Sequence, residues 1–447
     1  MLIMRKPELR KRIFKTSAPA MLEMALYMLI GVVDVAVVGH LGAVPLAAVG
    51  LGAQVFFSII ISAEALGIGA SILVAQAKGA GKMEHAQQVT AQTLTLALLI
   101  GIPLAFLGVV YAGSILELFP VTKDVHTQAL SYLQITFKVA PVAIALYLIN
   151  SVFRGLARTD IPMKIAVIQN IINCVGDYVL VYGVSFFPAL GVAGAAWATV
   201  IAHTAAFIIA LWALIGGWTE LKIKLKEMLF FQFDIIKKIV RLGLPSFAEE
   251  AFFSAAGWIS YILVTLLGTL SLASHQVTLT VESLSFMPGF GVSIAATTLV
   301  GQAVGAKNKQ LALDTARGCA EVALLFMGFL GLLFALVPHP IAAVFTSDPE
   351  IIVLTGILIR IASLEQVTIA LSMVLGGILK GSGDTRTPMF INAFFTWFFR
   401  LPLMCLFIRV FSLPISYTWA LFVVDWLLRT AAFLFAIKKQ KWLKDAS

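Results

Sequence analysis

Long, uninterrupted apolar runs are the feature of this sequence that most constrains its fold. A helix needs about 20 apolar residues to cross a bilayer, and residues 87–112 form one such run without a single charge. Only 12% of the 447 residues are charged, against about 25% in soluble domains. The runs do not alternate as β-barrel strands do. Because lipid leaves few ways to satisfy the backbone, the sequence predicts an all-α polytopic membrane protein.

The sequence predicts twelve transmembrane helices. They cover approximately residues 13–39, 46–75, 87–112, 125–152, 162–182, 189–217, 239–265, 272–302, 312–337, 347–377, 387–410 and 414–437. Lys and Arg concentrate in alternate connections, so the positive-inside rule places both termini in the cytoplasm. The chain is expected to lie in the inner membrane. The short connections leave no room for a soluble catalytic domain. The net charge of +9 is therefore interpreted as a topology signal, with membrane lipids and no nucleic acid as partners.

An internal repeat divides the chain into halves. Several short segments recur with one constant offset, among them Leu41-Gly42 and Leu267-Gly268, Gln76-Ala77 and Gln302-Ala303, Pro19 and Pro245, and Arg154-Gly155 and Lys380-Gly381. A single register across separate segments indicates a tandem duplication, and such halves suit alternating access about a cavity between them. We therefore predict an N-lobe over 1–217, a cytoplasmic linker over 218–238 and a C-lobe over 239–447. Within the linker, Lys222, Lys224 and Lys226 favour an interfacial segment or a plain hydrophilic loop equally.

Two acidic residues lie well inside predicted spans of the first half. An ionisable group in a membrane helix is costly and usually marks an ion pathway or proton relay. Asp34 lies in the first span, and Asp177 shares one face of the fifth span with Asn173 and Asn170. Thr199 of the sixth span adds a hydroxyl group. These residues are predicted to form a proton or cation site; the alternative is a polar clamp between helices.

The second half lacks both acids. At the repeat offset, Ser260 replaces Asp34 and Leu403 replaces Asp177, so we expect ion coupling in the first half. The second half carries acids of its own, for which a structural role is the favoured interpretation. They are Glu249, Glu250, Glu282, Glu365 and Asp425, the last of which is spaced for an ion pair with Arg429.

These segments resemble the multidrug and toxic compound extrusion (MATE) family over essentially the whole chain. The resemblance rests on the span from Pro19 to Asp34 with Gly39-His40-Leu41-Gly42, on Gln76-Ala77-Lys78-Gly79 with its repeat, and on Lys380-Gly381-Ser382-Gly383-Asp384-Thr385. It is closest to the DinF-like branch. The NorM-type branch has a glutamate in span 7 and an aspartate in span 10. Glu249 or Glu250 matches the first, but Ile369 occupies the second position, which favours coupling in the N-lobe.

The resemblance implies two six-helix lobes around a central cleft and efflux of small amphipathic, mostly cationic drugs in exchange for protons or sodium. It assigns Asp34 as the span 1 acid, Asn173, Asp177 and Thr199 as the cation cluster, and Pro19 as a hinge. Met24 and Tyr27 lie on roughly the same helical stripe as Asp34 and are expected to line the substrate cleft. No cofactor is expected, and the chain is expected to be a monomer. A lipid-linked saccharide flippase and, less favoured, a membrane-embedded enzyme remain the alternatives.

Overall fold

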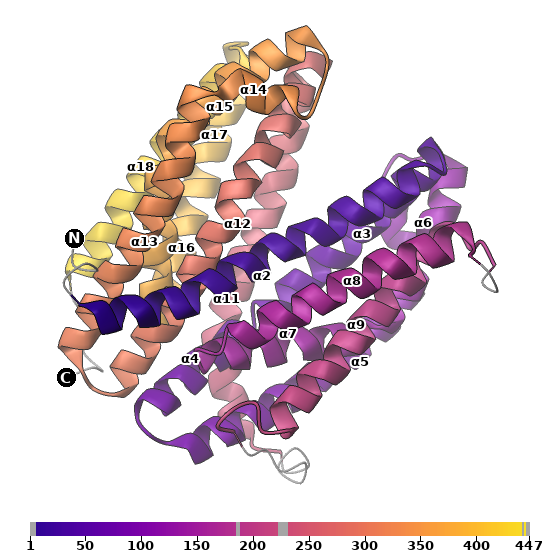
Figure 1. Cartoon of the computed structure of the whole chain (residues 1–447). Helices are drawn as coiled ribbons and strands as arrows, with labels where there is room; N and C mark the ends of the chain where they lie inside the picture. The colour runs from indigo at the N-terminus through magenta and orange to yellow at the C-terminus, as the bar shows by residue number, and fades with distance from the viewer. Residues whose placement is uncertain (1–5, 185–187, 222–230, 440–441, 444–447) are drawn as a thin grey trace. The chain divides into compact units, whose positions relative to one another are not determined.

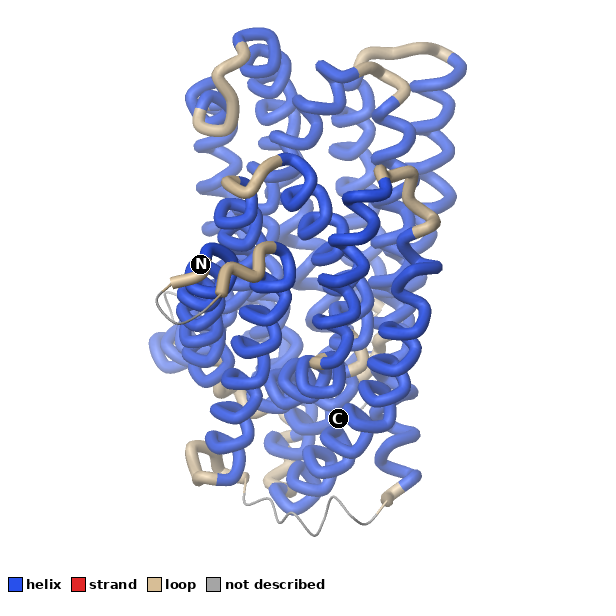
Figure 2. Tube along the Cα trace, turned by 90° about the vertical axis from the view of Figure 1, so that its right-hand side faces the viewer, coloured by secondary structure: helices blue, strands red, loops and turns tan. Residues whose placement is uncertain are grey.

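A computed structural model describes residues 6–184, 188–221, 231–439 and 442–443. Within these ranges the chain is helical and contains no β-strand (Figure 2). Two compact units are present, one formed by residues 22–247 and the other by 1–21 with 248–447. We call them the N-unit and the C-unit. The predicted all-α fold is therefore confirmed.

The N-unit combines most of the first half of the chain. Its helices are the second part of α2 (Pro7–Gly39), α3 (Ala43–Glu64), α4 (Gly67–Gly79), α5 (Met83–Leu116), α6 (Lys123–Lys138), α7 (Ala140–Gly155), α8 (Asp160–Tyr182), α9 (Val192–Ile215) and the first part of α11 (Phe233–Thr265). The helices α8 and α9 pack along each other, as do α5 and α7 (Figure 1). The chain bends by 56° between α6 and α7, where Pro141 occupies the first turn of α7 and interrupts the helical hydrogen bonding.

The C-unit is built around one long central helix. That helix, α15, packs against α12, α13 and α18. The helices of this unit are the first part of α2, the second part of α11, α12 (Thr269–Gly305), α13 (Lys309–Leu336), α14 (Pro338–Ala343), α15 (Pro349–Ser382), α16 (Arg386–Phe394), η1 (Phe395–Arg400), α17 (Leu401–Cys405), η2 (Leu406–Val410) and α18 (Ile415–Lys438).

Every predicted apolar run coincides with one helix or one interrupted helix. In the described part of the chain, nine helices are long and apolar enough to span a membrane, and the bent pair α6 and α7 makes a tenth. The remaining two predicted runs correspond to α2 and α11. One detail differs, because the predicted first span begins at residue 13, whereas α2 begins at Pro7 and includes Arg10, Lys11 and Arg12 in its first turns. Lys6 pairs with Asp314, and Arg12 donates to Gln302, so this basic segment is held against the C-unit helices.

The repeat is visible in the helix boundaries. The helices α2 and α11 begin at Pro7 and Phe233, and α5 and α13 begin at Met83 and Lys309. Both pairs of boundaries are related by the offset that relates Leu41 to Leu267 in the sequence. The two halves therefore share helix boundaries as well as short sequence segments.

The compact units have different boundaries from the predicted lobes. The boundaries between the units fall between residues 21 and 22 and between residues 247 and 248, inside α2 and α11. The predicted lobes instead divide at the connection 218–238. Each long helix therefore contributes its first turns to one unit and its remaining turns to the other. Of the predicted linker, Lys222, Lys224 and Lys226 lie outside the described residues.

Close packing of α8 against α9 depends on glycine. A Cβ atom added at Gly176 would lie 3.1 Å from Cβ of Ala198, which is tighter than normal packing allows. Small residues let membrane helices approach closely. We expect Gly176→Val to lower the free energy of unfolding by about 1–3 kcal/mol because the added side chain pushes α9 away. Unfolding of purified protein in detergent measures this effect. Gly328→Val is the control, since Gly328 has open space around it, and equal losses in both variants would contradict the packing argument.

Candidate functional site

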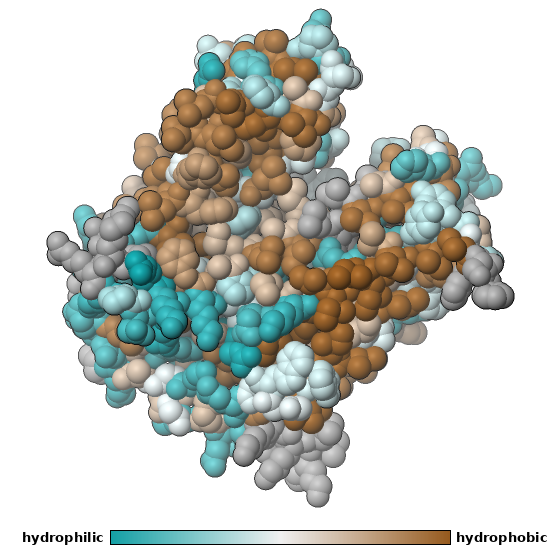
Figure 3. All heavy atoms as spheres, in the orientation of Figure 1, coloured by the Kyte–Doolittle hydropathy of each residue, from teal (hydrophilic) through white to brown (hydrophobic). Residues whose placement is uncertain are grey.

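Helix α8 turns its polar side chains inward and its large apolar side chains outward. Gln169, Asn173 and Asp177 are buried in the N-unit. The exposed side chains of the same helix are Ile168, Ile171, Val175 and Tyr178, and they contribute to the hydrophobic surface along α8 (Figure 3). A lipid-facing surface is compatible with this pattern because hydrocarbon cannot hydrate polar groups. The fold therefore buries the predicted acid of α8.

Asp34 and Asp177 meet inside the N-unit. Both side chains are at most 1% exposed, and the two carboxyl groups interact with each other. A direct hydrogen bond between two carboxyl groups requires one of them to carry a proton, since ionised carboxylates only accept hydrogen bonds. The Asn173 amide donates to Oδ2 of Asp177 at 3.2 Å. Among the described residues, no Lys or Arg forms an ion pair with either acid. This pair can share a proton.

Two further hydroxyl groups complete the site. Tyr132 of α6 is buried and interacts with Thr199, Asp34 and Asp177. The Thr199 hydroxyl donates to the Ala195 carbonyl at 3.1 Å, which leaves its oxygen able to accept a hydrogen bond. The site therefore offers carboxyl, amide and hydroxyl oxygens from α2, α6, α8 and α9. Sequence reasoning missed Tyr132, because no spacing relates α6 to the other helices.

The other predicted site residues lie away from this pair. Asn170 lies seven residues before Asp177, which is about 10 Å along α8, so it is too far away to join the pair. It is half-buried and donates to the Ala166 carbonyl of its own helix at 2.8 Å. Met24 is buried, and Tyr27 donates to Glu23 at 3.2 Å. Their expected role in lining a cleft stays a prediction. Pro19 lies within α2, and its role as a hinge also stays a prediction.

A second polar network of the N-unit surrounds Arg154. The predicted span 125–152 ends before Arg154, but the structure places this residue in the last turn of α7, where it is only 6% exposed. Its Nη2 donates to Oε1 of Glu23 at 2.6 Å, and its Nη1 donates to Glu64 at 2.8 Å. Two acids from other helices thus compensate the buried charge, which no local pattern in the sequence reveals.

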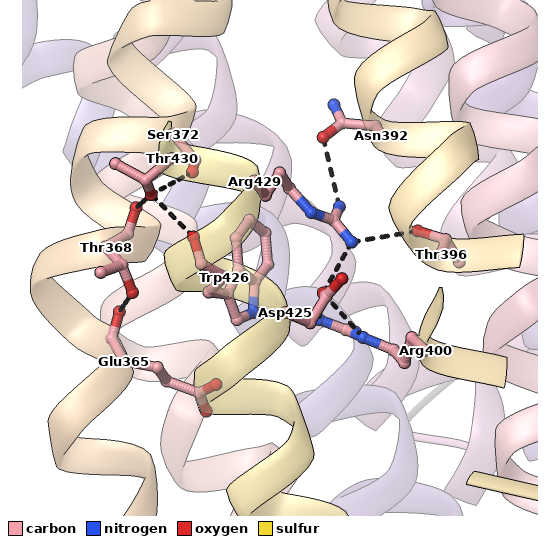
Figure 4. Close-up of polar contacts among 10 residues, drawn as sticks. All are labelled: Glu365, Thr368, Ser372, Asn392, Thr396, Arg400, Asp425, Trp426, Arg429 and Thr430. Carbon is pink, nitrogen blue, oxygen red and sulfur yellow. Dashed lines mark hydrogen bonds and ion pairs between the residues drawn. The ribbon is translucent and has the colours of Figure 1, made fainter. Parts of the chain in front are cut away.

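The C-unit buries a cluster in which two basic side chains contact one acid (Figure 4). Two guanidinium groups converge on one oxygen of Asp425: Nη2 of Arg400 lies at 2.5 Å and Nη2 of Arg429 at 2.7 Å. Arg429 also donates to Asn392 and Thr396, each at 3.2 Å. The predicted pair of Asp425 and Arg429 is therefore present. Arg400 was missed because it lies in the π-helical turn η1 of a different helix.

The other C-unit acids noted in the sequence are Glu249, Glu250, Glu282 and Glu365. Glu249 pairs with Lys380 at 2.9 Å and accepts a hydrogen bond from Asn392 at 2.6 Å. Glu282 and Glu365 interact with each other, and Arg400 acts on both. Glu250 also has an interaction partner. In contrast to Asp34 and Asp177, Glu249, Glu282 and Glu365 have basic residues close by.

A protein-family model matches this chain twice. The model, described as MatE, covers residues 19–179 and 245–406, and the starts of the two matches are related by the same offset as Pro19 and Pro245. The chain belongs to the MatE family. It is therefore an integral membrane transporter and not an enzyme.

Two curated relatives illustrate the similarity of this MatE protein. The probable multidrug resistance protein NorM of Thermotoga maritima is 31% identical over 441 residues, covering 98% of this chain and 94% of the relative. The multidrug resistance protein MdtK of Proteus mirabilis is 27% identical, covering 83% of this chain and 82% of the relative. These comparisons place the chain in the family, and the closer similarity to the DinF-like branch stays a prediction.

Solved structures share the fold of this MatE protein. A crystal structure of MATE in the bent conformation has a TM-score of 0.91 and 23% identity, covering 100% of this chain and 98% of that chain. An outward-facing multidrug resistance MATE transporter has a TM-score of 0.89 and 24% identity, covering 98% of this chain and 97% of the other. At this identity the comparison establishes the fold alone.

Proposed function

We propose that this chain is a secondary active antiporter that exports small amphipathic, mostly cationic compounds in exchange for protons. The observation that carries the proposal is the buried carboxyl pair of Asp34 and Asp177. Two carboxyl groups this close disfavour simultaneous ionisation in a low-dielectric interior. A cationic compound favours their ionised form and a proton favours the neutral form, so cargo and proton compete for the same charge.

Multidrug export is supported by the names of two relatives. NorM of T. maritima and MdtK of P. mirabilis are both named multidrug resistance proteins. We further propose an inner-membrane location with both termini in the cytoplasm, supported by the basic connections on that side of the predicted topology. The chain is proposed to act as a monomer.

Sodium is the competing coupling ion. Carboxylate, amide and hydroxyl oxygens are hard ligands that also suit a small cation, and Asn173, Thr199 and Tyr132 supply them beside the two acids. We favour protons because the two carboxyl groups are buried together and interact with each other. An exchange that brings in one more positive charge than it exports gains about 2.3 kcal/mol from a membrane potential of 100 mV. That energy supports a several-tenfold drug gradient, since a tenfold ratio corresponds to about 1.4 kcal/mol.

Transport under separately imposed gradients tests this proposal. The full chain is reconstituted in liposomes, and movement of ethidium, a fluorescent amphipathic cation, is followed with either a pH gradient or a sodium gradient. We expect the pH gradient alone to drive transport and the sodium gradient to add nothing. Transport driven by sodium at equal pH on both sides would replace the proton with sodium, and transport independent of both gradients would contradict antiport.

A further inference from the structure

Each of the two long helices that joins the units is bound by an ion pair directly after it enters its second unit. Helix α2 enters the N-unit at Leu22, and Glu23 pairs there with Arg154 of α7. Helix α11 enters the C-unit at Ala248, and Glu249 pairs there with Lys380 of α15. The two acids are related by the repeat offset, and so are the two bases, so the duplication preserved this arrangement in both halves.

The contacts in the N-unit are the more extensive of the two. Arg154 reaches both oxygens of Glu23, at 2.6 Å to Oε1 and 3.4 Å to Oε2, and it also binds Glu64 of α3. The Tyr27 hydroxyl donates to Glu23 and accepts a hydrogen bond from Asn150 at 3.3 Å. A forked guanidinium group held by two acids fixes direction as well as distance. This network therefore restricts rotation of α2 about its own axis.

The repeat position of Glu64 is apolar. It is occupied by Phe290, and Lys380 has a single ammonium group in place of a planar fork. Such a group acts as a point charge and imposes less geometry on its partner. The more extensive contact is therefore the one made by α2, the helix that also carries the buried Asp34. At the corresponding position α11 carries Ser260 in place of Asp34.

Restricting rotation at Glu23 also sets the direction of Asp34. The two residues are eleven positions apart, which in an α-helix is about three turns and about 16 Å, and places both side chains on the same face. Glu23 faces Arg154 and Glu64. Asp34 faces Asp177 and Asn173 on α8, Tyr132 on α6 and, through that tyrosine, Thr199 on α9. A rotation of α2 that separates Glu23 from Arg154 also turns Asp34 away from Asp177.

We infer that Arg154 is a positioning residue for proton coupling: by binding Glu23 and Glu64, it holds α2 in the rotation that directs Asp34 at Asp177. The inference rests on the proposed function, because it assigns Arg154 a role in the action of Asp34. It goes beyond that function in naming an arginine that does not contact the coupling pair.

The pH dependence of transport tests this inference. Full-length protein in liposomes is assayed with ethidium as wild type, Arg154→Gln and Lys380→Gln, the last being the matched change at the repeat position. We expect Arg154→Gln to move the midpoint of the pH profile by about one unit, because the two carboxyl groups no longer titrate as a pair. Lys380→Gln is expected to leave the midpoint in place. An equal movement in both variants would overturn the inference, since α11 carries no coupling acid.

Further variants separate a failed inference from a failed function. If Asp34→Asn removes pH-driven transport while folded Arg154→Gln keeps the wild-type midpoint, the positioning role is overturned and the proposed function stands. If Asp34→Asn transports normally, the proposed function fails and the inference fails with it. Should Arg154→Gln not fold, Arg154→Lys keeps the charge without the fork, and we expect a smaller movement of the midpoint. An unchanged midpoint in that variant would overturn the inference.

Discussion

Asp34→Asn is expected to reduce pH-driven drug transport by at least about tenfold, because the asparagine side chain cannot exchange a proton. Asp177 would then lose the carboxyl group with which it shares the site. Asparagine has nearly the same size as aspartate and can still hydrogen-bond, so we expect the fold to be kept. The measurement is the initial rate of ethidium transport in liposomes under an imposed pH gradient. A tenfold loss of rate corresponds to about 1.4 kcal/mol of activation free energy.

Ser260→Ala is the matched control for this variant. Ser260 is the repeat partner of Asp34 on α11, and its hydroxyl group has no part in the proposed coupling. We therefore expect its transport rate to remain within about twofold of wild type, and its stability to change by about 0.5 kcal/mol or less. Asp34→Asn protein that keeps both the rate and the pH dependence of wild type would remove Asp34 from the mechanism.

Asp425→Asn is expected to destabilise the protein by about 3–5 kcal/mol. The two guanidinium groups of Arg400 and Arg429 converge on one oxygen of this buried side chain (Figure 4). Replacing the carboxylate with an amide removes the negative charge that both guanidinium groups contact. Removing one partner of a buried ion pair is costly because the other charge stays desolvated. Chemical unfolding of purified protein in detergent measures the loss.

A surface ion pair provides the comparison. Glu220 pairs with Lys78 at 3.2 Å, but its side chain is 65% exposed, so Glu220→Gln is expected to change stability by about 1 kcal/mol or less. Combining Asp425→Asn with Arg429→Gln removes one of the stranded charges, and we expect this double variant to recover part of the loss. Non-additivity of that kind is typical of residues in one network. Equal stability of Asp425→Asn and wild type would show that Asp425 does not hold the two arginines.

The sequence predicted those site residues that are polar or charged within an apolar run. Asp34 and Asp177 interrupt apolar runs, and the i, i+4 spacing predicted the contact of Asn173 with Asp177 that the structure contains. Tyr132 gave no such signal, because a tyrosine does not interrupt an apolar run. Arg400 interrupts the predicted span 387–410 near its middle, but no local spacing relates it to Asp425 on the next helix. Their roles depend on which helices lie beside them.

The amino-acid sequence was enough to predict the helical class, the twelve apolar runs, the duplication with its constant offset and the two acids of the first half. These follow from local composition and from periodicity, because the cost of placing charge or bare backbone in lipid applies at every position. The packed helices were needed to show that Asp34 meets Asp177 beside Tyr132, that Arg154 is buried between Glu23 and Glu64, and that Arg400 joins Arg429 at Asp425. Such contacts join residues that are far apart in the chain and lie on different helices. Helix packing brings them together, and no rule of local spacing encodes it.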